Sequence, residues 1–382
     1  MLFRISLYVS LFLFVLGILY RTCNWFRREV GKGGKGTPPS VRLTSAMRGT
    51  FKALTSKRIF YLIKTLLMDV FLQLRILQDK DDRILWVMHI LIFVGFMLLV
   101  IMHALGSLLT QALFSDYQST LNPFLFLRNF FGVLVCAGLV LAIMRRSGLK
   151  KNRVRTTGMD SFVIVVFIVI IVSGFLLEGA KISSSSIFRQ MTEDYATVAN
   201  AGEHKALEAY WVAEFGVISS DVKEPLPREL VARGKEVHEM SCASCHSRPQ
   251  SAFISYPLSR AMKPVAQDLD EVGFPKALWI IHFMACFVGL AYLPFSKMFH
   301  IIATPVSLLV ASAGEGKEDP ATEATRNVIE LDGCRHGGTC HPECPVRQMR
   351  QERINQTHPF EPEVDFLGGK SWKELGCRPF NT

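Results

Sequence analysis

Residues 238–248 read HEMSCASCHSR and contain Cys242, Cys245 and His246 in a C-x-x-C-H pattern. This pattern is the attachment site of a c-type haem: the two thiols add to the vinyl groups of the porphyrin, and the histidine binds the iron. A C-x-x-C pair also occurs in redox disulfides and as half of a zinc site, but the adjacent histidine favours haem. The sequence therefore predicts one covalently attached haem c.

The candidates for the second axial ligand of this haem are nearby thioethers and imidazoles. Met262 follows the motif in SRAMKP and is the predicted ligand. A methionine thioether bound to haem iron raises its reduction potential. His204, His238 and Met240 are the alternatives. Residues 231–246, VARGKEVHEMSCASCH, resemble the first helix of class I c-type cytochromes, which carries an aromatic residue where this chain has His238.

Four further histidines lie in or at the ends of long apolar stretches: His89, His103, His282 and His300. An ionisable side chain inside a membrane is rare and usually functional. His89 and His103 are 14 residues apart, and His282 and His300 are 18 apart. At about 100° per residue, each pair falls near one face of its helix. Neutral imidazoles bind haem iron, and iron with two histidine ligands has no open site for oxygen and carries electrons.

The helices that carry these histidines are expected to run in opposite directions across a bilayer. This arrangement pairs His103 with His282 at an outer haem b, and His89 with His300 at an inner haem b. The unequal spacings imply helix tilt or a kink at Pro294. A proton relay is the alternative, because chains of histidines also occur in pumps. Relays usually include Asp or Glu, which the apolar centres of both stretches lack. We therefore predict two b haems.

The elements that must hold these residues are stretches long enough to cross a membrane. The chain has 382 residues, of which 49% are hydrophobic. About 18 or more residues with few charges indicate a membrane-spanning helix. Five such stretches occur, at about 2–20, 84–113, 123–144, 160–178 and 277–296, the last with an extension towards residue 312 left open. The first of them is interpreted as a retained anchor, because no small-residue cleavage site follows it.

Positive charges predict the orientation. The formal net charge is +10, and Lys and Arg are concentrated after the first and third stretches, whereas residues 114–122 contain none. The positive-inside rule then places the N-terminus and residues 181–275 in the periplasm and the C-terminus in the cytoplasm. Haem c is attached on the outer side, so the motif and the charges agree. Because the charges lie beside apolar stretches, we expect a multi-pass protein of a bacterial inner membrane and no nucleic-acid partner.

These observations predict an all-α membrane protein, a five-helix transmembrane bundle with an external haem c loop domain and a cytoplasmic tail. Residues 46–78 alternate basic and apolar residues, which suits a helix at the lipid interface or one packed on a partner subunit. The predicted segments are a first span and exit (1–30), a linker and interfacial helix (31–83), spans two to four (84–180), the haem c domain (181–275), span five (276–312) and the tail (313–382).

The tail contains DGCRHGGTCHPECP at residues 332–345. Compared with the ferredoxin pattern C-x2-C-x2-C-x3-C-P, Cys334, Cys340 and Cys344 are in register, and Gly337 replaces one cysteine. One hypothesis is an iron–sulfur cluster: a three-iron cluster on these three thiolates, or a four-iron cluster completed by Cys377, His336 or a ligand from a partner. Zinc, for which His341 is a further ligand, and a motif without metal are the others. Cys23, Cys136 and Cys286 lie in or beside apolar stretches and are interpreted as packing residues.

Five spans with histidines in the second and fifth resemble the gamma subunits of respiratory nitrate reductase and the cytochrome b subunits of heterodisulfide reductase. The stretch RILWVMHILIFVGFMLLVIMHAL and the 18-residue spacing carry this resemblance, which covers about residues 1–310. The Dsr- and Tmc-type redox complexes of sulfate reducers are the most similar in character. The resemblance implies electron exchange with menaquinone near one haem and docking of a cytoplasmic iron–sulfur subunit. The haem c loop and the cysteine-bearing tail depart from the simple family pattern.

The predicted function is electron transfer across the membrane through one haem c and two b haems. The expected partners are a periplasmic multihaem cytochrome c, menaquinone, a cytoplasmic iron–sulfur subunit and the lipid bilayer. A quinol-oxidising subunit that releases protons on one side is an alternative, for which Gln111 or Lys181 is the candidate polar residue. A haem-bearing anchor without turnover is the third hypothesis.

Overall fold

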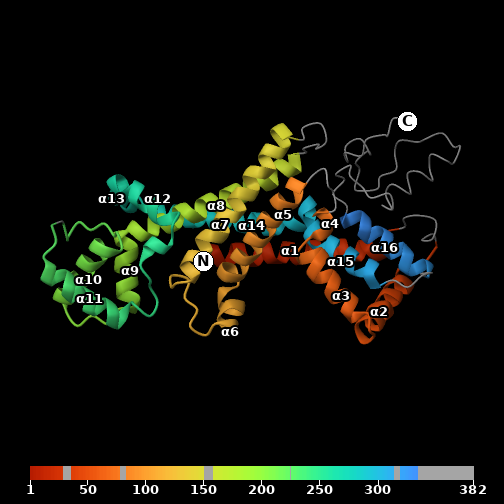
Figure 1. The fold of residues 1–382 in the computed structure, drawn as a ribbon, viewed down its shortest axis with the longest axis horizontal. Coiled ribbons are helices and arrows are strands. Elements are labelled where there is room, and N and C mark those ends of the chain that lie inside the picture. Colours follow the sequence, from red (N-terminus) through yellow and green to blue (C-terminus); the bar gives the residue numbers. More distant parts are fainter. Residues whose placement is uncertain (29–35, 78–82, 150–157, 224, 314–318, 334–382) are drawn as a thin grey trace. The chain divides into compact units, whose positions relative to one another are not determined.

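The protein is described by a computed structural model over residues 1–28, 36–77, 83–149, 158–223, 225–313 and 319–333. In these ranges the secondary structure consists of helices and contains no strand, which confirms the predicted all-α class. Figure 1 shows the helices in sequence colours. The chain divides into two compact units. Unit 1 comprises Met1–Trp86, Ala142–Val163 and Phe287–Thr382, and unit 2 comprises Val87–Leu141 and Ile164–Cys286.

Five helices of the described chain are long and apolar enough to cross a membrane, as predicted. The helical segments that form them are α1 (Leu2–Arg27), α5 (Arg83–Leu99) with the π-helix η3 (Val100–Ala104), α7 (Phe124–Met144) with its π-helical end η5 (Arg145–Leu149), α8 (Gly158–Ser183), and α14 (Phe274–Tyr292) with the 3₁₀-helix η8 (Leu293–Phe295).

The second span is regular only as far as Leu99. A π-helical turn follows in η3, and after Leu105 the chain continues through the π-helix η4 (Gly106–Thr110) and α6 (Gln111–Leu113). π-Helical turns often occur at functional sites, because they insert a residue and change the direction of the side chains that follow. The α-helical spacing assumed between His89 and His103 therefore does not hold over its last residues.

The fifth span does not continue as one helix to residue 312. Pro294 lies in the 3₁₀-helix η8, and Ser296 is extended, with φ −116° and ψ 176°. Proline lacks the N–H that an α-helix needs and clashes with the preceding turn, so the predicted kink is a complete break. After the 3₁₀-helix η9 (Lys297–Phe299) the chain resumes as α15 (His300–Ala313). His282 and His300 therefore lie on separate helices.

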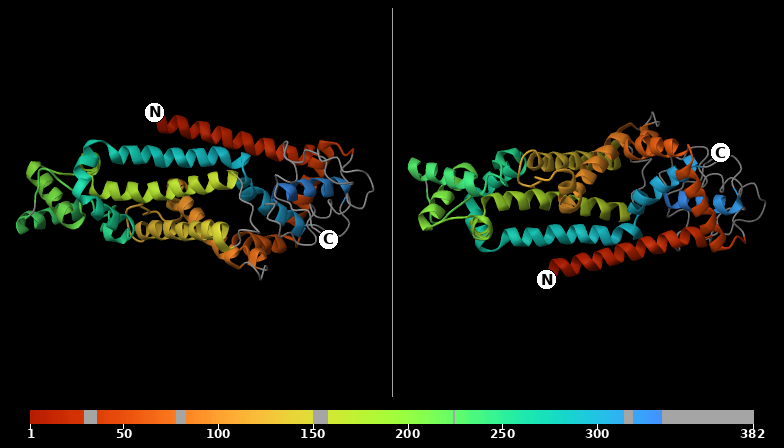
Figure 2. Two further views of the ribbon diagram at one scale, coloured as in Figure 1. Left: turned by 90° about the horizontal axis from the view of Figure 1, so that it is seen from above. Right: turned by 90° about the horizontal axis from the view of Figure 1, so that it is seen from below.

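Unit 2 contains parts of four spans and the subdomain between α8 and α14. Within this unit α5 packs on α7 at Gly138 and Ile92, and Phe96 of α5 lies 4.8 Å from Phe167 of α8, measured between ring centroids. Figure 2 shows α7, α8 and α14 running alongside one another. Together with η3, these helices bring His103, His282 and the polar groups described below into one bundle.

The region between α8 and α14, which we call the α9–α13 subdomain, contains five α-helices among its described residues. A hydroxyl and an amide oxygen cap two of them: Ser184 Oγ accepts the Ile187 N–H, and Asn200 Oδ1 accepts the Glu203 N–H. Its core consists of Phe188, Leu207, Tyr210, Trp211, Phe215, Val217, Val237 and Cys242. The helices are α9 (Ser185–Tyr195), α10 (Ala201–Glu214), α11 (Arg228–Ser241), α12 (Ser255–Met262) and α13 (Ala266–Glu271).

Unit 1 has a second core, built from Trp25, Phe299, Ala303, Val328, Ile329 and Leu331. Arg42 is fully buried beside it and donates hydrogen bonds to the carbonyl oxygens of Trp25 and Arg28, which satisfies the end of α1. The other helices of this unit are α2 (Pro39–Thr55), α3 (Ile59–Thr65), the π-helix η2 (Leu66–Phe71), α4 (Leu74–Leu77) and α16 (Pro320–Gly333).

The predicted interfacial helix over 46–78 is divided into α2, α3, η2 and α4. α2 packs its Ala53 side inwards, whereas Met47 and Phe51, one turn apart, are 66% and 70% exposed. The amphipathic character expected from the sequence is therefore present on α2, and the single long helix is not.

Candidate functional site

His103 and His282 lie next to each other within unit 2. Their ring centroids are 6.1 Å apart, and the ring planes are inclined by 62°. An imidazole nitrogen binds a metal at about 2 Å, so two imidazoles on opposite sides of one iron have centroids about 6 Å apart. The observed separation therefore fits a pair of haem ligands.

The ring of His282 is oriented by backbone and hydroxyl groups of α8. Its Nδ1 atom lies 3.0 Å from the carbonyl oxygen of Ile170 and 3.1 Å from Ser173 Oγ. A carbonyl oxygen can only accept, so Nδ1 carries the proton and Nε2 keeps its lone pair for a metal. Gly174 leaves room for this ring, because a Cβ atom there would lie 3.2 Å from His282 Cε1.

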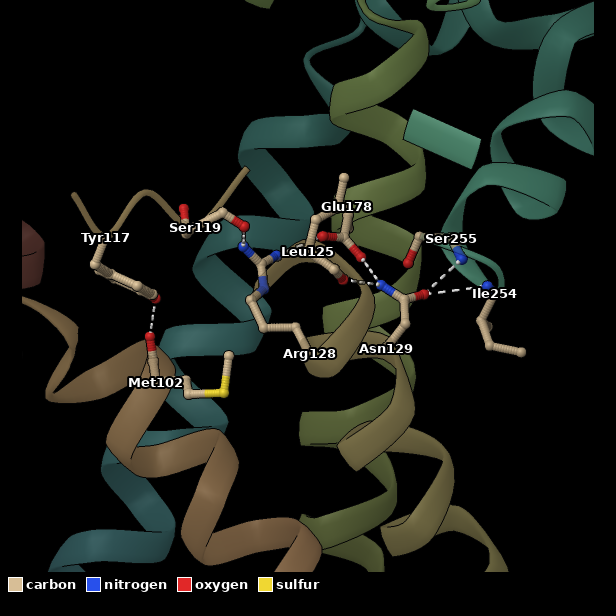
Figure 3. A network of polar contacts seen from close by, with 9 residues as sticks. All are labelled: Met102, Tyr117, Ser119, Leu125, Arg128, Asn129, Glu178, Ile254 and Ser255. Carbon is tan, nitrogen blue, oxygen red and sulfur yellow. Dashed lines mark hydrogen bonds and ion pairs between the residues drawn. The ribbon is translucent and has the colours of Figure 1, made fainter. Parts of the chain in front are cut away.

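The backbone that carries His103 is stabilised from outside its helix. The π-helical turn leaves carbonyl oxygens without their usual α-helical partners. Thr110 Oγ1 donates to the carbonyl oxygen of Ile101 at 2.9 Å, and the Tyr117 hydroxyl donates to that of Met102 (Figure 3). These two bonds fix the turn in which His103 projects towards His282.

The predicted inner pair is divided between the two units. His89 belongs to unit 2 and His300 to unit 1, so their pairing stays a prediction. The ring of His300 is also oriented by a carbonyl oxygen: its Nδ1 lies 2.7 Å from that of Lys297, so Nδ1 carries the proton and the lone pair of the ring is on Nε2. The Lys297 ammonium forms an ion pair with Asp160 of α8 at 3.0 Å.

The C-x-x-C-H residues follow directly on α11. The Cys242 N–H bonds to His238 O at 2.8 Å, and the His246 N–H bonds to Cys242 O at 2.9 Å, so Cys242 and His246 are held one turn apart. The His246 ring lies 5.3 Å from that of Trp211, and Cys242 is buried in the same core. The predicted attachment residues thus form a compact loop against an aromatic core.

Burial keeps both groups of this loop neutral. Burial, together with the nearby Cys245, raises the pKa of Cys242 to about 11. Burial and the adjacent His238 lower the pKa of His246 to about 4. A neutral imidazole at neutral pH has the free lone pair that iron binding requires.

The candidates for the second haem c ligand differ in their surroundings. Met262 packs with Leu177, Ala180 and Leu278, where α8 and α14 meet, rather than in the core around Cys242. Met240 is 78% exposed. His238 is 6% exposed and lies 5.7 Å from the Trp211 ring, and its Nδ1 is buried without a hydrogen-bond partner among the described residues. The fourth candidate, His204, lies 3.2 Å from Thr192 Oγ1 through its Nε2 atom.

Three residues that the sequence analysis did not single out form a polar network beside the His103 turn (Figure 3). Glu178 of α8 accepts from Arg128 Nη2 at 2.5 Å and from Asn129 Nδ2 at 2.7 Å. The Asn129 side chain is fully buried, and its Oδ1 accepts from the backbone N–H groups of Ile254 and Ser255. The charged residues within apolar stretches were a visible signal for this network.

The structure does not place the remaining predicted residues in a site. Gln111 and Lys181, the candidates for a quinone contact, are both exposed. Cys334, Cys340, Cys344, Cys377, His336 and His341 lie outside the described residues, so the tail hypotheses stay open. Within the described ranges, no three His, Cys, Asp or Glu side chains gather as a metal-ion site.

The chain is similar to subunits of heterodisulfide reductase and of a menaquinol oxidoreductase. The chain is 30% identical to the E subunit of dihydromethanophenazine:CoB–CoM heterodisulfide reductase of Methanosarcina thermophila over 126 residues, 31% of this chain and 47% of the relative. It is 24% identical to the protein of that name from Methanosarcina barkeri over 191 residues, 45% of the chain and 69% of the relative. It is also 24% identical to the Hdr-like menaquinol oxidoreductase cytochrome b-like subunit of Archaeoglobus fulgidus over 190 residues, 44% of the chain and 55% of the relative.

The chain thus spans about half the length of the first of these relatives. No family model matches the chain, and no solved structure matches it. The resemblance to heterodisulfide reductase subunits is confirmed at low identity, and the five apolar helices agree with a multi-pass membrane protein.

Proposed function

We propose that this chain, two of whose homologues are named as the E subunit of heterodisulfide reductase, is the cytochrome b-like membrane subunit of an oxidoreductase complex. Two b haems and one haem c carry electrons between the two sides of the membrane. The observation that supports this most directly is the His103–His282 pair, with rings 6.1 Å apart and His282 Nδ1 bonded to a backbone carbonyl.

The residues have distinct roles in this proposal. His103 and His282 bind the outer haem b, His89 and His300 the inner haem b, and Cys242, Cys245 and His246 hold haem c. When bound, haem iron supplies reversible one-electron transfer. Because a bilayer core is about 30 Å thick, several haems are needed as successive sites for the electron. The orientation follows from the charge distribution, with residues 181–275 in the periplasm and the tail in the cytoplasm.

The names of the relatives favour one further activity at the same sites. One relative is named a menaquinol oxidoreductase subunit, and the names of the other two contain dihydromethanophenazine. Oxidation of menaquinol near one haem b, with proton release on that side, is therefore the second candidate function. The other partners are a periplasmic multihaem cytochrome c and a cytoplasmic iron–sulfur subunit.

Haem composition tests the proposal. A pyridine haemochrome assay on the purified full-length protein is expected to show two haems b for each haem c. His103→Ala and His282→Ala should each remove one haem b and leave haem c in place, whereas Gln118→Ala, an exposed residue of the same unit, should remove none. Retention of both b haems in the two histidine variants would refute the pairing.

A further inference from the structure

Residues 117–122, which we call the connecting loop, contact the backbone beside two predicted haem ligands. The Tyr117 hydroxyl donates to the carbonyl oxygen of Met102, the residue before His103. The Thr120 hydroxyl donates, at 2.6 Å, to the carbonyl oxygen of Cys245, the residue before His246. Tyr117 and Thr120 are three residues apart, which is at most about 10 Å of extended chain. One short loop therefore joins the two predicted sites.

Further hydrogen bonds attach this loop to the C-x-x-C-H segment. The Ser247 N–H donates to Thr120 O at 3.0 Å, and the Asn122 N–H donates to Ser247 Oγ at 2.9 Å. The Asn122 side chain donates to Ser251 Oγ at 2.7 Å. Together with the Thr120–Cys245 bond, four hydrogen bonds connect the loop to residues 245–251.

The other end of the loop is attached to the helix bundle. Tyr117 is 7% exposed, and burial raises its pKa, so its hydroxyl stays protonated and able to donate. Arg128 Nη1 donates to Ser119 O at 3.0 Å while Nη2 pairs with Glu178. Asn129, bonded to the same carboxylate, caps the start of α12 (Figure 3). The C-x-x-C-H segment and the start of α12 are thus both tied to α7 and α8.

We propose that the connecting loop and Asn129 hold haem c at a fixed position relative to the outer haem b, so that electrons pass between them without movement of the α9–α13 subdomain. This inference rests on the proposed function. One electron leaves the reduced iron and the oxidised iron accepts it, and no bond or proton changes. The opposite arrangement is a mobile haem domain that carries its electron between two positions.

The haem-loaded full-length protein in lipid nanodiscs tests this inference in two ways. The rate of electron equilibration between haem c and haem b after photoreduction should not change when glycerol raises the viscosity. Saturation-recovery electron paramagnetic resonance should show one population of haem c, magnetically coupled to haem b. An electron-equilibration rate that decreases as the viscosity rises, in inverse proportion to it, would overturn the inference.

The matched variants are Thr120→Val with Asn122→Ala, against Gln118→Ala in the same loop, whose side chain is exposed. The double variant removes two side-chain hydrogen bonds between the connecting loop and residues 245–251, so the fraction of haem c that is not coupled to haem b should rise by about tenfold. Gln118→Ala should leave it unchanged. An unchanged uncoupled fraction in the double variant refutes the loop's role. Haem content, measured first, separates this result from failure of the proposed function, in which haem c or haem b would be missing.

Discussion

Gly234 of α11 lies directly against the backbone of α10, and its replacement tests how the C-x-x-C-H motif is supported. A Cβ atom at this position would lie 1.9 Å from the carbonyl oxygen of Ala206 and 2.8 Å from Tyr210 Cβ. Ordinary contacts need about 3.5 Å, so in Gly234→Ala the two helices must separate by roughly 1.5 Å. The obstacle is backbone and cannot rotate away as a side chain could.

The expected cost is the balance of two effects. Alanine is favoured over glycine inside a helix by about 1 kcal/mol, whereas overpacking a core costs about 1–3 kcal/mol and more where backbone must move. Because separation of the helices also disturbs Trp211, which contacts His246, we expect a net loss of about 2 kcal/mol in the subdomain and reduced attachment of haem c.

The assay is the ratio of haem c to haem b in purified protein, with limited proteolysis of the subdomain as a second measurement. Gly234→Ala should lower this ratio and increase cleavage between residues 196 and 254, while both b haems remain. Gly49→Ala is the control, because nothing lies within 4 Å of a Cβ atom there. Full haem c content and unchanged cleavage in Gly234→Ala, or loss of the b haems as well, would contradict the reasoning.

Three further predictions concern other parts of the molecule. Asn129→Ala leaves the N–H groups of Ile254 and Ser255 and one Glu178 oxygen without partners and should cost about 2–4 kcal/mol, measured by thermal denaturation. Burial acts to raise the pKa of Asp270, but hydrogen bonds from three serines outweigh it and lower the pKa, so stability that is present above its ordinary value of 3.8 should be lost as the pH falls further. Asp270→Asn should abolish this acid dependence, and an unchanged pH profile would contradict it. Phe51→Trp, on the exposed apolar face of α2, should be quenched by brominated lipids, because residues 40–68 carry Lys and Arg and no acidic residue, and absence of quenching would instead favour a protein partner.

The sequence was sufficient for those features that depend on local composition. Five apolar stretches predict five helices because hydrocarbon thickness sets their length, and the structure has them. Because their spans are expected to run in opposite directions, the sequence predicts that His103 pairs with His282. In the structure the two ring centroids are 6.1 Å apart. Asn129 could not be found in this way, because its partners, Ile254 and Ser255, are 125 and 126 residues away. Its amide is a helix cap supplied by another helix, for which no local pattern exists.

The breaks in the two histidine-bearing spans follow the same logic. Pro294 predicts a bend, but a complete break at Ser296 also changes which groups reach His300. In an unbroken α-helix the carbonyl oxygen of Lys297 would accept from the N–H four residues on. In the 3₁₀ turn it accepts the backbone N–H of His300 and also lies 2.7 Å from His300 Nδ1, so the ring proton is on Nδ1 and the lone pair on Nε2. For His282 the same orientation comes from a neighbouring helix, through Ile170. The helix break therefore provides at His300 the carbonyl contact that a neighbouring helix provides at His282, so regular helical spacing is not needed to orient either ring.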